Sequence, residues 1–236
     1  MTTEDDTEPK EYRQHRFAPP PGATDILLVR HGESAPARED RPFELVDGQG
    51  DPELAPEGRE QARRVAERLC NEPIDAVYVT SLRRTRETAQ PLLDRLGIEA
   101  TVEREFREVH LGDWESGIFR KHVSEGHPIA VQMGLQERWD VIPNAEKSED
   151  FAARVRGAVE KIAAAHPDGR VVVFTHGGVI GQVLSLASRS RPFAFLGADN
   201  ASISQIVVTG ERWIVRRFND TAHLGPLFSV EPDPLT

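Results

Sequence analysis

Two histidines in this sequence each stand one residue after an apolar run that is typical of a buried strand, and both precede a glycine. His31 stands after the apolar run 26–29 and Arg30, and His176 stands just after the apolar run 171–174. Runs of branched apolar residues are typical of strands that are buried on both faces. Ligands of open α/β sheets bind at the carboxyl ends of such strands. We therefore expect an anion site there, with Arg30 binding the anion and His31 as nucleophile or general base.

Composition excludes several classes of partner. The formal net charge is −10, which argues against a nucleic-acid surface. No apolar run approaches the roughly 20 residues of a membrane-spanning helix, and the polar start shows no signal-peptide pattern. The single cysteine, Cys70, excludes an internal disulfide framework. These features predict a cytoplasmic protein without nucleic-acid or membrane partners.

Strand and helix patterns alternate along the chain. This alternation predicts an α/β fold, a three-layer α/β/α sandwich with a mainly parallel central sheet. Ser81 is the predicted N-cap of the second helix. The predicted strands lie at about 25–30, 76–79, 99–102, 171–174, 202–209 and 212–218, and the predicted helices at about 56–70, 82–96, 148–165 and 178–188.

The segments outside this alternation define the expected domain organisation. Residues 1–23 are acidic and then proline-rich, which predicts a mobile N-terminal arm. A single domain covers 24–223, with a small cap insertion at about 103–147, and 224–236 form a tail. The long loop 32–54 is of a length that is usually functional or disordered.

Several segments, in order, resemble the motifs of the histidine phosphatases, the superfamily that includes cofactor-dependent phosphoglycerate mutase. Residues 28–34 match its Arg-His-Gly signature, and 174–180 match its second-histidine motif. Residues 54–62 resemble its first-helix motif. Residues 80–89 resemble the segment with a second phosphate-binding arginine, and 107–115 the segment with the proton donor. The resemblance covers about residues 25–222.

The resemblance implies a metal-independent phosphatase that acts on a small phosphorylated metabolite through a phosphohistidine, without a cofactor. Two guanidiniums can bind phosphoryl oxygens in a forked geometry and take over the charge neutralisation that a metal would supply. One carboxyl group can protonate the leaving alkoxide and then activate water. The implied catalytic residues are His31, Glu108 and His176, and the implied substrate-binding residues are Arg30, Arg84 and Gly177.

Residue chemistry alone leaves rivals for two of these positions. Arg83 and Arg86 are as basic as Arg84, and Glu105 and Glu115 are as acidic as Glu108, so the motif alignment makes the choice. The remaining histidines of the domain are expected at the surface, with no metal-ligand cluster among them. Trp114 and Trp139 are expected to pack in the core or cap. The surface histidines are His110, His122, His127 and His166.

Alternatives to a phosphatase remain open at this point. Mutases of this family usually carry an asparagine three residues after the serine equivalent to Ser34, and here that position is Ala37. This departure favours a phosphatase over a phosphoglycerate mutase. A non-catalytic phosphoprotein-binding module is the third interpretation. The two closing strands could offer a homodimer edge, and the cap is expected to set substrate specificity.

Overall fold

The computed structural model describes residues 11–210 and 212–225. The central sheet is six-stranded and has the order β5-β4-β6-β1-β7-β8. Its first four strands in this order run parallel, while β7 lies antiparallel to both neighbours, so the predicted mainly parallel sheet is confirmed. The strands are β1 (Thr24–Arg30), β4 (Ala76–Val79), β5 (Ala100–Val102), β6 (Arg170–Thr175), β7 (Ile203–Thr209) and β8 (Arg212–Asp220).

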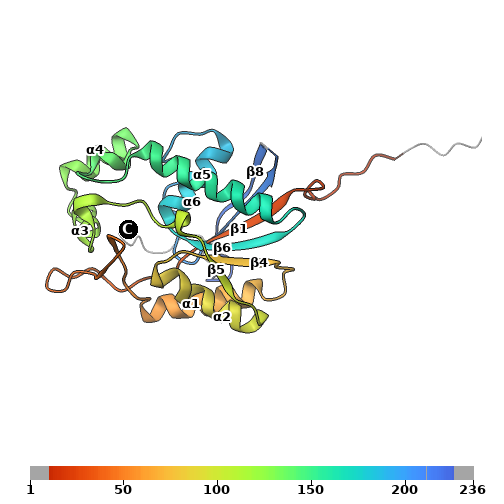
Figure 1. Cartoon of the computed structure of the whole chain (residues 1–236), viewed down its shortest axis with the longest axis horizontal. Coiled ribbons are helices and arrows are strands. Elements are labelled where there is room, and N and C mark those ends of the chain that lie inside the picture. The colour runs from red at the N-terminus through yellow and green to blue at the C-terminus, as the bar shows by residue number, and fades with distance from the viewer. Residues whose placement is uncertain (1–10, 211, 226–236) are drawn as a thin grey trace, which may run out of the picture.

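Helices cover both faces of the sheet (Figure 1). α1 (Pro56–Leu69) and α2 (Arg83–Leu96) lie on one face, and α5 (Ser148–Ala165) and α6 (Gly177–Ser188) lie on the other. Side chains of β1 alternate between these layers. Ile26 and Leu28 join the core with α5 and α6, whereas Leu27 and Val29 join the core with α1 and α2. The three-layer arrangement is therefore the one that the apolar runs predicted.

The segment expected as a cap consists of short helices at one end of the molecule. Figure 1 shows α3 (Ile118–Ser124) and α4 (Pro128–Gln136) at that end. The short 3-10 helices η1 (Arg104–Phe106), η2 (Gly112–Trp114) and η3 (Trp139–Val141) complete the segment. Within the described ranges, no helix is long and apolar enough to cross a bilayer.

The loop 32–54 and the chain ends complete the description. The loop contains a small hairpin formed by β2 (Leu45–Val46) and β3 (Gln49–Gly50). Residues 11–20 are exposed and have no regular secondary structure. Of the predicted arm and tail, residues 1–10 and 226–236 lie outside the described residues.

The prediction that Ser81 caps α2 is wrong. α2 begins at Arg83 with Leu82 as its N-cap, and no cap bond comes from a Ser81 side chain. Instead, the backbone N–H of Arg83 donates to Asp51 Oδ1 at 2.6 Å. A carboxylate is stabilising at the positive, amino end of a helix. Asp51 belongs to the loop 32–54, which α1 and β4 separate from α2 in the sequence, so local sequence could not show this contact.

Candidate active site

Strand register brings the two histidines together. β1 and β6 are parallel neighbours in which Arg30 pairs with Thr175, so the next residues emerge side by side. The rings of His31 and His176 lie with centroids 5.3 Å apart in an edge-on arrangement. Both side chains are buried, at 6% and 0% exposed. The expected juxtaposition at the carboxyl edge of the sheet is therefore present in the structure.

The turn after Arg30 needs glycine because it touches α1. A Cβ on Gly32 would lie 2.5 Å from the carbonyl oxygen of Gly58 in the first turn of α1. A Cβ on Gly58 would in turn lie 2.0 Å from the carbonyl oxygen of Glu33. The Gly32 N–H also donates to Thr88 Oγ1 of α2 at 2.9 Å. Backbone contact thus fixes the position of His31 relative to both helices.

A backbone carbonyl sets the tautomer of His31. Its Nδ1 lies 2.7 Å from the carbonyl oxygen of Gly32, which can only accept a hydrogen bond. The proton therefore resides on Nδ1, and Nε2 carries the lone pair. Burial, followed by the charges of Arg84 and Arg30, holds the pKa of His31 well below its usual value. The imidazole is neutral and nucleophilic at neutral pH.

The two expected guanidiniums lie beside it, Arg84 buried and Arg30 half-buried. Arg84, in the first turn of α2, is 8% exposed and donates to the carbonyl oxygen of Gly50 at 2.9 Å. Burial lowers its pKa to about 10, so it stays charged at neutral pH. Arg30 donates to the carbonyl oxygen of Ala198 at 2.5 Å. A Cβ on Gly177 would lie 3.4 Å from Arg30 Nε, so this glycine adjoins the guanidinium.

Glu108 is held on the amino end of α6. Its Oε2 accepts from the N–H of Gly178 at 3.1 Å, and its Oε1 accepts from the N–H of Val109 at 2.9 Å. The Glu108 carbonyl oxygen accepts from Gln49 Nε2 at 2.6 Å and from Arg154 at 3.0 Å. Side chains of strand β3 and helix α5 thus fix the backbone of the residue that carries this carboxyl group.

A threonine pair orders the hydrogen bonds of His176. Thr85 Oγ1 donates to the Leu82 carbonyl oxygen at 2.8 Å, so the Thr80 hydroxyl donates to Thr85 Oγ1 at 2.9 Å. Thr80 Oγ1 then accepts from His176 Nε2, at 3.2 Å. This leaves Nδ1 of His176 as a buried acceptor without a partner among the described residues. Burial, then the charge of Arg84, holds the pKa of His176 well below its usual value.

A third guanidinium at the site, that of Arg120, was not predicted from the sequence. It lies in α3 and donates to the carbonyl oxygen of Ala35 at 2.9 Å and to Ser34 Oγ at 2.7 Å. Burial and then the charge of Arg30 lower its pKa. Its charge also contributes to lowering the pKa of His31. The segment around Arg120 lacks periodicity, so only its basic character could have marked it.

The cap and the sheet edge enclose a cavity of about 360 Å³. Arg30, His31, Arg84, Glu108 and Gly177 all line it, while His176 is fully buried and does not line it. The alternative basic and acidic residues have other contacts. Arg83 lies 3.7 Å from Glu87, and Arg86 donates to the Ser81 carbonyl oxygen at 2.5 Å. Glu105 is exposed, and Glu115 accepts from the backbone N–H groups of Gly50 and Leu111, each at 2.8 Å.

The cap aromatics and histidines differ in part from expectation. Trp114 and Trp139 are buried and also line the cavity. His122 and His127, expected at the surface, are half-buried against Trp114, with ring centroids 4.7 and 5.3 Å from it. His110 and His166 are likewise only half-exposed. No group of three or more potential metal ligands occurs in the described part of the chain.

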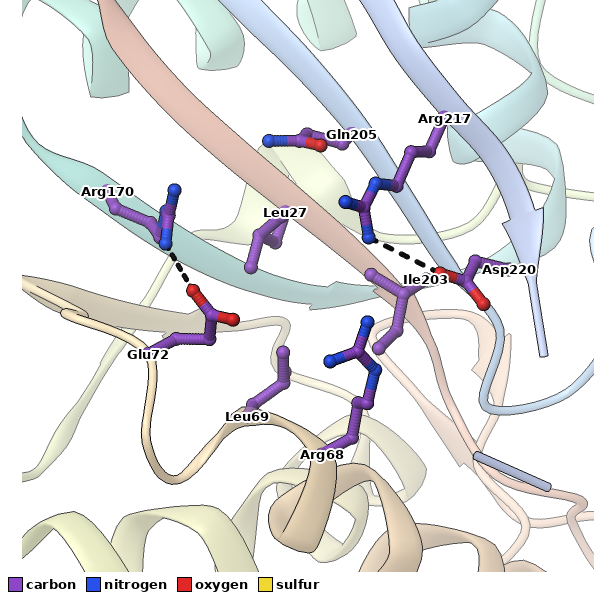
Figure 2. A pocket seen from close by; sticks show the side chains of 9 residues that line it. All are labelled: Leu27, Arg68, Leu69, Glu72, Arg170, Ile203, Gln205, Arg217 and Asp220. Carbon is purple, nitrogen blue, oxygen red and sulfur yellow. Dashed lines mark hydrogen bonds and ion pairs between the residues drawn. The ribbon is translucent and has the colours of Figure 1, made fainter. Parts of the chain in front are cut away.

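A second, smaller pocket lies on the α1 side of the sheet, away from the histidines. Its volume is about 60 Å³, enough for about two water molecules. Figure 2 shows Arg170 beside Glu72 and Arg217 beside Asp220 across this pocket. Two of the three arginines that line this pocket are thus paired with carboxylates, and neither His31 nor His176 lines it, so the pocket does not match the anion site expected from the sequence.

Comparisons with known proteins agree with this geometry. A family model, the histidine phosphatase superfamily (branch 1), matches residues 26–221. Phosphoglycerate mutase-like protein 4 of Arabidopsis thaliana is 37% identical over 207 residues, which cover 85% of this chain and 86% of that protein. A metal-independent phosphoserine phosphatase of the same plant is 33% identical over 207 residues, covering 85% and 83%. The solved structure of a mycobacterial glucosyl-3-phosphoglycerate phosphatase superposes with a TM-score of 0.70 at 28% identity, covering 84% of this chain and 100% of that one. The protein belongs to the histidine phosphatase superfamily.

Proposed function

We propose that the protein is a metal-independent phosphatase that hydrolyses small phosphomonoesters through a phosphohistidine at His31. The observation that carries the proposal is the hydrogen bond from His31 Nδ1 to the Gly32 carbonyl oxygen, at 2.7 Å. It leaves the Nε2 lone pair available for attack on phosphorus. The superfamily match and the phosphatase-named relatives support a phosphomonoesterase. The covalent route and the substrate are our proposal.

The proposed reaction has two steps that use the same groups. His31 Nε2 attacks phosphorus, the bond from phosphorus to the ester oxygen breaks, and Glu108 gives its proton to the leaving alcohol. Glu108, now a carboxylate, takes a proton from water while the water oxygen attacks phosphorus. The bond from phosphorus to Nε2 then breaks and inorganic phosphate leaves. Arg30, Arg84 and Arg120 offset the phosphoryl charge throughout.

His176 completes the phosphoryl site in this proposal. Its Nε2–H donates to Thr80, so only the buried Nδ1 remains to meet a ligand. A neutral Nδ1 can accept a hydrogen bond from a protonated phosphoryl oxygen, and the ring stays neutral because burial and then the charge of Arg84 hold its pKa well below the usual value. The cavity of about 360 Å³ lies near the lower end of the range for small-molecule sites, which favours a metabolite over a phosphoprotein.

Phosphate release from a panel of phosphomonoesters, measured in the presence of a metal chelator, tests the proposal. We expect turnover with the chelator present, its loss in His31→Ala, and its retention in the control His15→Ala, which changes an exposed residue of the arm. Interconversion of 2- and 3-phosphoglycerate with little phosphate release would instead support a mutase. Undiminished turnover in His31→Ala would overturn the proposal.

A further inference from the structure

We propose that the preferred substrates carry an uncharged, apolar body, as in an aryl or long alkyl phosphate. This inference rests on the proposed phosphatase function and concerns what the cavity holds beyond the phosphoryl group. Phosphoserine and phosphoglycerate are the opposite class, because their bodies carry further charges. The cavity distinguishes these classes by the chemistry of its walls.

The walls of the cavity are mainly aromatic and aliphatic. They come from three separate parts of the chain: the loop 32–54, the cap, and the connection from α6 to β7. Such walls favour a body that loses water-exposed apolar surface on binding. The principal wall side chains are Phe43, Trp114, Phe119, Met133, Trp139 and Leu196.

The arginines of the cavity gather around His31, where the charges of Arg84, Arg30 and Arg120 all act on its ring. Arg120 lines the same cavity, and burial, followed by the charge of Arg30, lowers the pKa of its guanidinium. Arg120 also donates to two groups of the turn after His31, Ser34 Oγ at 2.7 Å and the Ala35 carbonyl oxygen at 2.9 Å. This third cation therefore belongs with the phosphate and not with the wall.

The polar groups that border the walls are already engaged. Glu115 accepts from the backbone N–H groups of Leu111 and Gly50, each at 2.8 Å. Gln49 donates its side-chain amide to the Glu108 carbonyl oxygen at 2.6 Å. Among the described lining residues, no lysine and no further arginine is present to receive a second anionic group. A substrate carboxylate against these walls would lose its hydration without gaining a partner.

The aromatic side chains of the cavity wall pack against a further phenylalanine that does not line the cavity. Trp139 is 7% exposed and packs between two phenylalanines, with its ring centroid 6.2 Å from Phe119 and 4.9 Å from Phe193. Phe119 lines the cavity, whereas Phe193 does not. The wall is thus a packed layer, and these two phenylalanines form a matched pair for mutation.

The decisive comparison sets kcat/KM for the alkyl ester 2-(2-naphthyl)ethyl phosphate against kcat/KM for 3-phosphoglycerate and for O-phospho-L-serine. All three esters release an alkoxide, so they differ in the body and not in the kind of leaving group. We expect at least a tenfold preference for the naphthyl ester. Equal values, or a preference for either charged ester, would overturn this inference. Phosphate release from those charged esters would leave the proposed phosphatase function intact, so the two failures are distinguishable.

Wall variants test the same point. Phe119→Ala should lower kcat/KM for the naphthyl ester at least tenfold, whereas the control Phe193→Ala should retain it within about threefold. Leu196 is 42% exposed at the cavity, so Leu196→Arg can fold while it places a cation in the wall. That variant should shift the preference at least tenfold toward 3-phosphoglycerate, and the control Leu196→Met should not. Equal effects of each variant and its control would contradict the inference.

Binding to the variant His31→Ala separates recognition from turnover. Calorimetry should show tighter binding for the naphthyl ester than for 3-phosphoglycerate, by at least tenfold. The reverse order would overturn the apolar assignment even if wild-type turnover is slow. Absence of phosphate release from every ester by the wild type, with this binding order retained, would overturn only the proposed catalytic function.

Discussion

Gly178 lies so close to Glu108 that a single methyl group at this position should displace the carboxyl group. A Cβ there would lie 2.4 Å from Glu108 Oε1 and 3.2 Å from its carboxyl carbon. Favourable carbon contacts begin near 3.5 Å, so the carboxyl end must retreat by about 1 Å in Gly178→Ala. The backbone of residue 178 is helical, and alanine adopts it readily. The fold should therefore survive.

The expected loss follows from the displacement of the proton donor. Misplacement of a reacting group by about 1 Å can cost about 100-fold in rate. The penalty should depend on the leaving group, because an activated aryl oxide leaves without a proton whereas an alkoxide does not. In rapid-quench experiments, the first-turnover rate of an alkyl phosphate should fall about 100-fold. The burst of nitrophenol from 4-nitrophenyl phosphate should fall by less than about tenfold.

Gly157→Ala is the control for this experiment. It changes a glycine in α5 whose added Cβ would meet no atom within 4 Å. It should leave both rates close to those of the wild type, and the melting temperature should not fall, because alanine favours a helix more than glycine does. Full alkyl-ester turnover by folded Gly178→Ala would refute Glu108 as the positioned proton donor. Equal losses on both esters would refute leaving-group protonation as its role.

Three further predictions concern the supports of the histidines. Gly58→Ala would place a Cβ 2.0 Å from the Glu33 carbonyl oxygen, so it should lower stability by more than about 2 kcal/mol in urea unfolding; an unchanged midpoint would contradict the packing described. Thr80→Val removes the acceptor of His176 Nε2–H and should lower kcat about tenfold, with recovery in Thr80→Ser; equal rates for both variants would show that the hydroxyl is not needed. Burial, then Arg84, depresses the folded-state pKa of both His31 and His176, so the unfolded chain binds more protons below pH about 6.5. The free energy of unfolding should therefore fall as the pH drops below about 6.5, by up to about 1.4 kcal/mol per pH unit for each histidine. Urea unfolding at several pH values should show a smaller slope for His31→Gln, and an unchanged slope would contradict the buried neutral state.

Features that repeat along the chain could be predicted from the sequence. The apolar runs before His31 and His176 indicated strands buried on both faces, and the structure places these strands as parallel neighbours. The motif resemblance selected Arg84 and Glu108 among equally suitable neighbours, and both line the cavity with His31. These residues are close to regular elements, so local pattern carried the information.

Contacts between distant segments could not be predicted in the same way. Arg120 reaches the turn after His31 from an aperiodic cap helix, across a separation of 86 positions to Ser34. The hairpin of the loop 32–54 holds Arg84 and Glu108 through the Gly50 carbonyl oxygen and the Gln49 side chain. The Asp51 contact that replaces a Ser81 cap depends on the same loop. Each contact joins segments that lie far apart in the sequence, so local pattern carries no information about it.

Identification of the phosphorylated atom tests the central claim most directly. The enzyme would be mixed with a phosphomonoester, quenched within its first turnovers, digested at alkaline pH, and its phosphohistidine isomer and position determined. Because His31 Nδ1 is hydrogen-bonded to the Gly32 carbonyl oxygen, we expect phosphate on Nε2 of His31. Phosphate on Nδ1 of His31, on His176, or on no histidine while the ester is hydrolysed would contradict the account.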